Sequence, residues 1–381
     1  MRLGLTDEQQ VFKDGCERFV HERWQGGDDA AAIAFRGAAI VAGYSHHWLP
    51  RRYGGVERPR DLVLEWIWIE ACRSANAPAR PGGTAVQMLV PTLLEAGTDE
   101  QRMRFLLPAL TGEEIWSQGF SEPGSGSDLA SLRTRGVIEN GNWVVEGQKI
   151  WTTHAEHAAF MFALVRTEPD APRHRGISFL LIDMRQPGVT VRPIRQMTGE
   201  HEYCEVFLDR AQAPLDAIIG GRGGGWAIAN QLLKHERSWI GDFVEERFAR
   251  LSTLVRESAI PDCEDLLVRL AAIEGKVLCH KASALRRLSG AAEGSPTALI
   301  DLVAKLYATE VMQAISHLAA DSIGSRILGP SDDPWGTGVS TTDGYWVRDW
   351  YWSIAYAVAG GTSNIQRDVI ALRGLGLARM A

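Results

Sequence analysis

The chain has 381 residues, of which 45% are hydrophobic and 23% are charged, and its formal net charge is -7 at pH 7. These values are typical of a globular protein with room for two or three domains, and they exclude disordered and fibrous proteins. The acidic balance provides no positive field that would attract nucleic acid, so nucleic acid is not an expected partner.

The cysteines, the histidines and the hydropathy pattern exclude further classes. The five cysteines are scattered without a CxxC pair, which argues against a zinc knuckle or a disulfide framework and favours a reducing compartment. No HxxxH or HExxH spacing occurs, so no metal site is expected. The N-terminus lacks the apolar core of a signal peptide, and no segment approaches the roughly 20 apolar residues of a membrane span. We therefore expect a cytoplasmic protein without a membrane span.

Helical patterns dominate the first part of the chain. Thr6, followed by Glu8 and Gln9, can cap a helix, and apolar residues recur behind it at helical spacing. Further helical patterns cover residues 30–43, 59–73, 83–96 and 98–110. We expect an N-terminal helical domain over residues 1–115.

Alternating runs replace the helical pattern from residue 116 onward. Asn140 and Gly141, which tolerate positive φ, lie between two such runs and predict a tight hairpin. Shorter strand patterns follow at residues 160–167, 176–184, 189–194 and 205–210. We expect a small antiparallel β-domain or barrel over residues 116–217.

The helical pattern returns after a glycine cluster at residues 220–225. These glycines lack the GK[ST] ending of a P-loop, and they favour a flexible entry to the next domain with Trp226 as an anchor. Amphipathic stretches of bundle length cover residues 226–258, 263–290 and 296–323. We expect a C-terminal helical bundle over residues 218–381, so the predicted fold class is α+β with several domains.

The segment FSEPGSGSD, residues 120–128, lies near the start of the predicted β-domain. Leu129 stands where a dinucleotide fingerprint needs its third glycine, and the order of elements is wrong, so a Rossmann site is excluded. The small residues suit either a plain loop between domains or a loop whose N–H groups and hydroxyls contact a phosphate or a flavin edge.

Two further segments carry candidate functional residues. Glu236 lies on an amphipathic helical pattern beside Arg237, either as half of a solvated pair or as a carboxylate that an apolar pocket turns into a base. Near the end, GGTSNIQR predicts a helix N-cap by Thr or Ser and leaves open whether the same loop faces a ligand. The tryptophans, Trp346 and Trp352 among them, are expected in the core or at an interface.

Taken together, these segments resemble the acyl-CoA dehydrogenase family, in particular its bacterial members. The likeness covers nearly the whole chain and rests on WLPRRYGG, WSQGFSEPGSGSDLASLRTR, WVVEGQKIWTT, the bundle segment HER and the terminal GGTSNIQR, in that order. The resemblance implies a flavoenzyme that holds FAD between the β-domain and the C-terminal bundle and acts on a saturated acyl-CoA thioester.

The resemblance also implies which residues contact the cofactor. Ser121 would lie at the isoalloxazine ring, while Gly126 and Ser127 would lie near the FAD phosphate and the CoA arm. Trp151 and Thr153 would pack and hydrogen-bond at the ring. Two residues of the terminal loop, Thr362 and Asn364, would also contact FAD.

The catalytic base is implied by a departure from the commoner family pattern. Many members carry the catalytic glutamate directly before GTS, where this chain has Gly360. Members similar to isovaleryl-CoA dehydrogenase carry it instead on the bundle helix, in a Glu-Arg pair that matches Glu236 and Arg237. The resemblance therefore implies that Glu236 removes the α proton, that the Gly360 N–H stabilises the developing enolate, and that Arg237 and Ser127 contact the substrate.

The expected partners follow from the same resemblance. They are an acyl-CoA substrate, an electron-transfer flavoprotein or similar acceptor, and further copies of the chain in a homodimer or homotetramer. The Phe-Gly of a family segment that reaches a neighbouring subunit's FAD is absent after Arg256, and a heterotetramer or a non-catalytic subunit stays open. A flavin monooxygenase and an acyl-carrier-protein-linked desaturase are the alternatives on the same fold. The acyl chain is not readable from the sequence.

Overall fold

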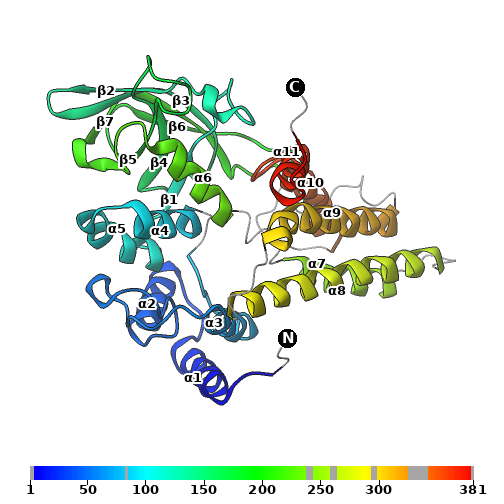
Figure 1. Cartoon of the computed structure of the whole chain (residues 1–381). Coiled ribbons are helices and arrows are strands. Elements are labelled where there is room, and N and C mark those ends of the chain that lie inside the picture. Colours follow the sequence, from blue (N-terminus) through cyan, green and yellow to red (C-terminus); the bar gives the residue numbers. More distant parts are fainter. Residues whose placement is uncertain are drawn as a thin grey trace. The chain divides into compact units, whose positions relative to one another are not determined.

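The computed structural model of the chain is shown in Figure 1. It describes residues 4–81, 85–236, 243–257, 264–292, 298–324 and 342–378. The chain divides into two compact units, one made of Met1–Ile194 with Glu202–His235 and the other of Arg195–His201 with Glu236–Ala381. The boundaries 1–115, 116–217 and 218–381 remain a proposed domain division.

The first unit begins with helices, which are α1 (Asp7–Arg23), α2 (Asp29–Val41), α3 (Leu62–Ser74), α4 (Ala85–Ala96) and α5 (Asp99–Thr111). Of these, α1, α2, α3 and α5 each start at a side-chain cap. Thr6 and Thr98 each form a capping box with the glutamine three residues later, which confirms the helix start predicted at Thr6. The helix predicted from residue 59 begins only at Leu62, because Asp61 accepts hydrogen bonds from the first free N–H groups and caps it there.

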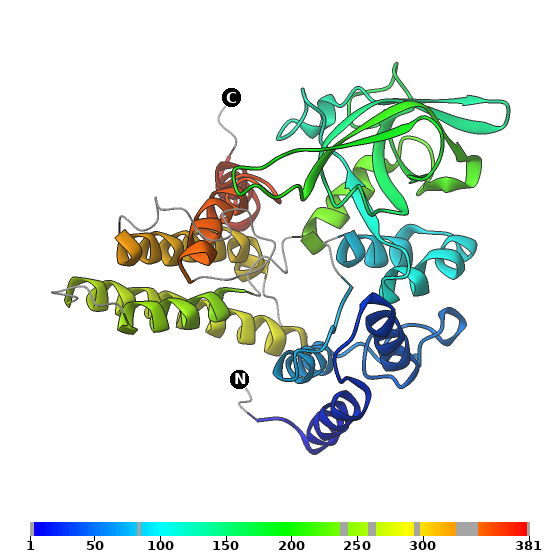
Figure 2. The same cartoon turned by 180° about the vertical axis from the view of Figure 1, so that it is seen from behind.

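The same unit contains an eight-stranded sheet. Its strands are β1 (Trp116–Gly119), β2 (Arg135–Glu139), β3 (Asn142–Thr153), β4 (Phe160–Arg166), β5 (Ile177–Asp183), β6 (Val189–Pro193), β7 (Tyr203–Pro214) and β8 (Ile218–Ile219). Their order is β6-β7-β3-β2-β4-β5-β8, with β1 paired to β4. Most pairings are antiparallel, as predicted, and the β1–β4 pair and one β2–β4 bridge are parallel. The views in Figures 1 and 2 both show α4 and α5 next to the sheet.

The β2–β3 hairpin confirms the turn predicted from the sequence. Asn140 has φ 49° and Gly141 has φ 79°, so both residues adopt the left-handed backbone that a two-residue hairpin loop requires. A single apolar core packs the sheet against α4 and α5, with Leu89, Leu106 and Phe162 fully buried in it. The sheet and the helices that pack on it therefore support the loops at the ends of the strands.

The glycine cluster before α6 (Gly225–Glu236) has a packing function. A Cβ on Gly225 would lie 2.5 Å from the Ser178 carbonyl carbon, and the Gly223 N–H donates to the Ser178 hydroxyl at 3.0 Å. The glycines thus allow close contact with β5, which corrects the expectation of a flexible entry. Trp226 packs on the apolar core with its ring centroid 4.6 Å from that of His174, so its predicted anchoring is confirmed.

The second unit is helical. Its helices are α7 (Val244–Glu257), α8 (Glu264–Ala292), α9 (Ala298–Ile323), α10 (Thr342–Tyr356) and α11 (Ser363–Val369), and a π-helical turn follows at Ile370–Gly374. Their core contains Met312, Ile315 and Trp346. The stretch predicted as one helix over 226–258 contains α6 and α7, and residues 237–242 between them lie outside the described part. Within the described ranges, no helix is both long and apolar enough to cross a membrane.

Candidate functional site

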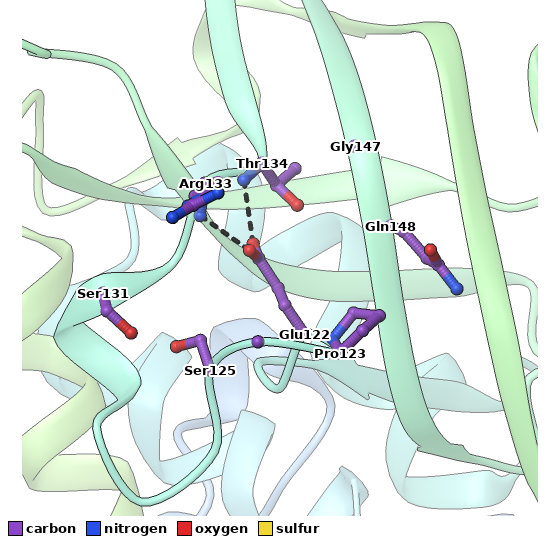
Figure 3. A pocket seen from close by; sticks show the side chains of 9 residues that line it. Glu122, Pro123, Ser125, Ser131, Arg133, Thr134, Gly147 and Gln148 are labelled. Atoms are coloured by element: carbon purple, nitrogen blue, oxygen red, sulfur yellow. Dashed lines mark hydrogen bonds between the residues drawn. The ribbon is translucent and has the colours of Figure 1, made fainter.

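The segment 120–128 forms a tight loop directly after β1. The backbone groups of Glu122 and Ser125 exchange two hydrogen bonds of 2.9 Å, and the Ser125 hydroxyl donates to the Asp128 carbonyl at 2.9 Å. A pocket of about 350 Å³ opens beside this loop (Figure 3). It is lined by Glu122, Pro123, Gly124, Ser125, Ser131, Arg133, Thr134, Gly147 and Gln148.

A buried ion pair holds the loop to the sheet. The Lys149 side chain is fully buried, and its Nζ lies 2.9 Å from Glu122 Oε1. The same ammonium donates to the carbonyls of Leu164 at 2.7 Å and Phe120 at 3.3 Å. Burial lowers the pKa of Lys149 to about 8. Burial alone would raise the pKa of Glu122, but the Lys149 charge and the donors around the carboxylate hold this pKa below its ordinary value.

Two glycines of the loop leave open space around it. A Cβ built on Gly124 or Gly126 would meet no heavy atom of the described residues within 4 Å, and neither glycine has positive φ. Crowding within the chain therefore does not explain these glycines. Ser127, beside them, is exposed. The absence of side chains thus leaves backbone N–H groups accessible to a bound group, and the Cβ-free space fits a ligand that lies against the loop.

Trp151 occupies an unusual position at the end of β3. The β3–β7 register shifts between Lys149 and Thr152, and Trp151 within this irregularity has φ 60° and a side chain that is 57% exposed. In a regular strand, Trp151 would point to the same buried side of the sheet as Lys149. The bulge reverses this alternation, so the indole points outward and Thr152 points inward. A left-handed backbone is strained for a bulky residue, and such strain clusters at functional positions.

The pocket also contains a polar atom without a partner. Thr134 is 1% exposed, and its hydroxyl forms no hydrogen bond among the described residues. In Figure 3, the Thr134 and Arg133 backbone N–H groups point to the Glu122 carboxylate, at 2.8 and 2.6 Å. The backbone of this segment is thus satisfied, and the Thr134 hydroxyl is enclosed between this backbone and Gly147.

In the second unit, Gly360 and Gly361 form a turn between α10 and α11. Their φ values of 64° and 94° require glycine. Gln366 Nε2 donates to the Gly360 carbonyl at 3.0 Å, and Lys305 Nζ donates to the Gly361 carbonyl at 2.8 Å. Among the described residues of this unit, none accepts a hydrogen bond from the N–H groups of Gly360, Gly361 or Thr362. The turn therefore combines fixed carbonyls with unpaired donors.

The other predicted residues of the terminal loop have local roles. The Thr362 hydroxyl accepts from the Ile365 N–H at 3.3 Å, so the predicted N-cap is confirmed. Asn364 is exposed, and its Oδ1 accepts from Arg367 at 3.4 Å. Neither observation tests contact with a cofactor, so that contact stays a prediction.

The predicted catalytic and binding residues fall in different parts of the structure. Ser121, Trp151 and Thr153 lie in the first unit, where the Ser121 carbonyl accepts from the Ile150 N–H at 3.0 Å. Glu236 is the last residue of α6, and its side chain lies outside the described part. Arg237 also lies outside the described residues. The assignment of the base therefore stays a prediction from the sequence.

Sequence reasoning missed the residues that support both loops. Lys149 lies an even number of residues after Trp143 and Val145 on β3, both of which are buried. This two-residue alternation could have identified Lys149 as a buried lysine. Lys305 is buried on α9, where its position within a helical pattern carries no comparable signal. Among the described residues, no group of three or more potential metal ligands occurs.

Comparison with known proteins identifies the family through the whole length of the chain. Models of the acyl-CoA dehydrogenase N-terminal, middle and C-terminal domains match residues 6–113, 117–211 and 223–375. The acyl-CoA dehydrogenase IpdE1 of Mycobacterium tuberculosis is 35% identical over 87% of this chain and 84% of its own. The acyl-CoA dehydrogenase FadE29 of the same organism is 28% identical over the full length of both chains.

Solved structures support the same relationship. A chain of the ChsE4–ChsE5 complex from Mycobacterium tuberculosis superimposes with a TM-score of 0.80 at 25% identity over all of both chains. A chain of the Tcur3481–Tcur3483 steroid ACAD gives the same TM-score at 22% identity, again over all of both chains, which shows a shared fold. This protein belongs to the acyl-CoA dehydrogenase family, whose members are FAD-dependent oxidoreductases that act on acyl-CoA.

Proposed function

We propose that this protein dehydrogenates an acyl-CoA thioester between its α and β carbons and releases a trans-2-enoyl-CoA. The observation that carries this proposal is the turn at Gly360 and Gly361. Removal of an α proton places negative charge on the thioester oxygen, and donors that are already oriented stabilise this charge most effectively. The unpaired N–H of Gly360 is the donor that we assign to the oxyanion.

Glu236 is the proposed general base. A carboxylate is needed to remove the α proton, and the residue before GTS in this chain is Gly360, which has no side chain to do so. Glu236 ends α6 in the Glu-Arg pair that part of the family uses for this purpose. Arg237 and Ser127 are the proposed substrate contacts.

The residues present fit a bound flavin. The open space over Gly126 and the outward indole of Trp151 both leave capacity for a ligand on the first unit. We assign FAD contacts to Ser121, Gly126, Ser127, Trp151, Thr153, Thr362 and Asn364. When bound, FAD supplies the acceptor for the β hydride. The chain itself supplies the base, the oxyanion donor and the placement of the substrate.

The partners are proposed on the same basis. An electron-transfer flavoprotein or similar acceptor would reoxidise the enzyme. We propose a homodimer or homotetramer. A heterotetramer is the alternative, because the similar ChsE4–ChsE5 structure is a complex of two proteins. The mass of the protein purified alone and after co-expression with a paired homologue separates these assemblies.

The test is anaerobic mixing of the FAD-loaded protein with a panel of linear, branched and ring-bearing acyl-CoA thioesters. Ring-bearing compounds belong in the panel because Tcur3481–Tcur3483, which has the same fold, is a steroid ACAD. We expect loss of the flavin absorbance near its visible maximum with one class and formation of the enoyl-CoA. An unbleached flavin with every thioester contradicts the proposal. A rapid reaction of the reduced flavin with oxygen would favour the monooxygenase. Bleaching by carrier-protein thioesters alone would favour the desaturase.

A further inference from the structure

The ion pair between Glu122 and Lys149 lies in the interior of the β-domain, where two charged groups lose their contact with water. Lys149 is fully buried, and its three ammonium protons match three acceptors, namely the Glu122 carboxylate and two carbonyls. Placing two charges in a protein interior costs several kcal/mol before their attraction is counted, and apolar residues of similar volume often stabilise a fold as well. Fold stability alone therefore does not explain the pair.

The pair joins segments that are far apart in the sequence. The Glu122 carboxylate accepts from Lys149 on β3 and from the N–H groups of Arg133 and Thr134 just before β2. Lys149 in turn donates to Leu164 on β4. Every oxygen of the carboxylate and every proton of the ammonium thus has a partner, and these partners lie on the loop after β1, on the segment before β2, and on β3 and β4. These hydrogen bonds fix the orientations of the Glu122 and Lys149 side chains as well as their positions.

The segments that the pair joins contain the proposed flavin contacts of the first unit. On one side, Lys149 binds the Phe120 carbonyl and the neighbouring Ile150 N–H binds the Ser121 carbonyl, so two successive peptides of the loop are tied to β3. On the other side, the bulge that turns Trp151 outward begins directly after Lys149. One buried pair therefore determines the placement of both the loop and the strand end.

We propose that Glu122 and Lys149 are positioning residues for FAD: their ion pair holds the Ser121 loop and the Trp151 end of β3 in the binding geometry before FAD arrives. This inference rests on the proposed function, because it requires that FAD binds to this loop and strand. We assign the pair no contact with the reacting atoms. It acts through the backbone of Phe120 and Ser121 and through the start of the β3 bulge.

The partly exposed carboxylate of Glu146, whose side chain is 31% exposed, provides a control on the same strand. Glu146 pairs with Arg135 across the β2–β3 hairpin, and the Arg135 side chain is 65% exposed. Glu122→Gln and Glu146→Gln make the same chemical change, one at the buried pair and one at a solvated pair. A solvated pair contributes little, so Glu146→Gln should behave as the wild type.

The experiment measures FAD affinity of the apoprotein, the visible spectrum of the bound flavin and the hydrogen exchange of the Ile150 amide without FAD. We expect Glu122→Gln to weaken FAD binding by about tenfold or more, since a hydrogen bond to a charged group is lost at a buried site. The flavin spectrum should shift, and the Ile150 amide should exchange faster. Glu146→Gln should leave all three readouts unchanged.

Glu122→Gln leaves the Lys149 charge unpaired in the interior, which can prevent folding, and a second variant avoids this problem. The double variant Glu122→Gln with Lys149→Met leaves no unpaired charge in the core and should fold, yet bind FAD weakly. Wild-type FAD affinity and spectrum in either folded variant would overturn the inference, even with a lower melting temperature. Failure of the wild-type apoprotein to bind FAD would instead refute the proposed function.

Discussion

Lys305, buried on α9, donates a hydrogen bond of 2.8 Å to the carbonyl of Gly361. Gln366 holds the preceding carbonyl, that of Gly360, at 3.0 Å. In a trans peptide the N–H points opposite to the carbonyl, so the N–H groups of Gly361 and Thr362 face away from these two donors. The interior of the second unit thus fixes the two peptides that directly follow the Gly360 N–H, the proposed oxyanion donor.

This relationship predicts the effect of Lys305→Met, which keeps the length of the side chain and removes the donor. Turnover should fall by about tenfold or more, because a loosened turn no longer holds its N–H groups in place for the developing charge. FAD affinity should fall less than turnover, because five of the seven proposed FAD contacts lie in the first unit and not on this turn. The exposed Lys281, paired with Glu245 on the surface, provides the control, and Lys281→Met should retain full turnover. An equal loss of turnover and FAD affinity in Lys305→Met would contradict this role.

The buried network around Asp349 predicts a change in stability. Asp349 Oδ1 lies 2.8 Å from Arg247 Nε, and its Oδ2 accepts from the Ser316 hydroxyl at 2.6 Å. Asp349→Ala leaves the Arg247 guanidinium buried without its counter-charge, so the free energy of unfolding should fall by about 3 kcal/mol. Chemical denaturation measures this change. Asp321→Ala, which removes an exposed partner of Arg269, should have a far smaller effect, and equal losses would argue against the network.

The loop between β6 and β7 predicts a change in local order. Glu200 accepts hydrogen bonds from Arg348 Nε at 2.6 Å and from Trp352 Nε1 at 2.9 Å, so the segment Arg195–His201 is attached to α10. Glu200→Ala removes both bonds and should make this segment cleavable by protease at lower enzyme concentrations. The exposed neighbour His201 is the control, and His201→Ala should resist cleavage as the wild type does. Unchanged resistance in Glu200→Ala would show that other contacts hold the loop.

His46 predicts a pH dependence of stability. Burial, together with the positive charges of Arg80 and Arg60, lowers the pKa of His46 from 6.5 to about 3. The unfolded chain therefore binds a proton at a higher pH than the folded protein does. The contribution of His46 to stability is complete above pH 6.5 and declines as the pH falls toward 3, by at most about 1.4 kcal/mol per pH unit.

The measurement compares the wild type with His46→Asn, because asparagine tolerates the left-handed backbone at this position, where φ is 46°. The difference in unfolding free energy between the two proteins should decrease steadily from pH 6.5 to pH 4.5. Titrating groups that do not interact with His46 contribute equally to both proteins and cancel, whereas the neighbouring His47 adds to the measured difference. Parallel stability curves over this range would exclude His46 as a source of acid sensitivity.

Local signals in the sequence predicted much of the fold. The capping residue Thr6 and the hairpin pair Asn140 and Gly141 act through neighbours within a few residues, so their structures follow from short patterns. The resemblance to the family located the FSEPGSGSD loop and the terminal glycines. These features depend on residue type and spacing alone, which a sequence displays directly.

The parts that could not be predicted depend on contacts between distant segments. Lys149 and Lys305 are charged residues whose burial is set by partners 27 and 56 residues away, at Glu122 and Gly361. The outward turn of Trp151 arises from a register shift against β7, which no periodicity reveals. The close packing of Gly225 on Ser178 likewise requires the tertiary fold.

The most direct test of the central claim compares the wild type with Glu236→Gln in anaerobic mixing with an acyl-CoA that the panel has shown to bleach the flavin. Glutamine keeps the shape of the side chain and cannot accept the α proton at neutral pH. We predict that Glu236→Gln binds FAD with wild-type affinity and leaves the flavin fully oxidised. Bleaching of this variant at the wild-type rate would contradict the assignment of Glu236 as the base.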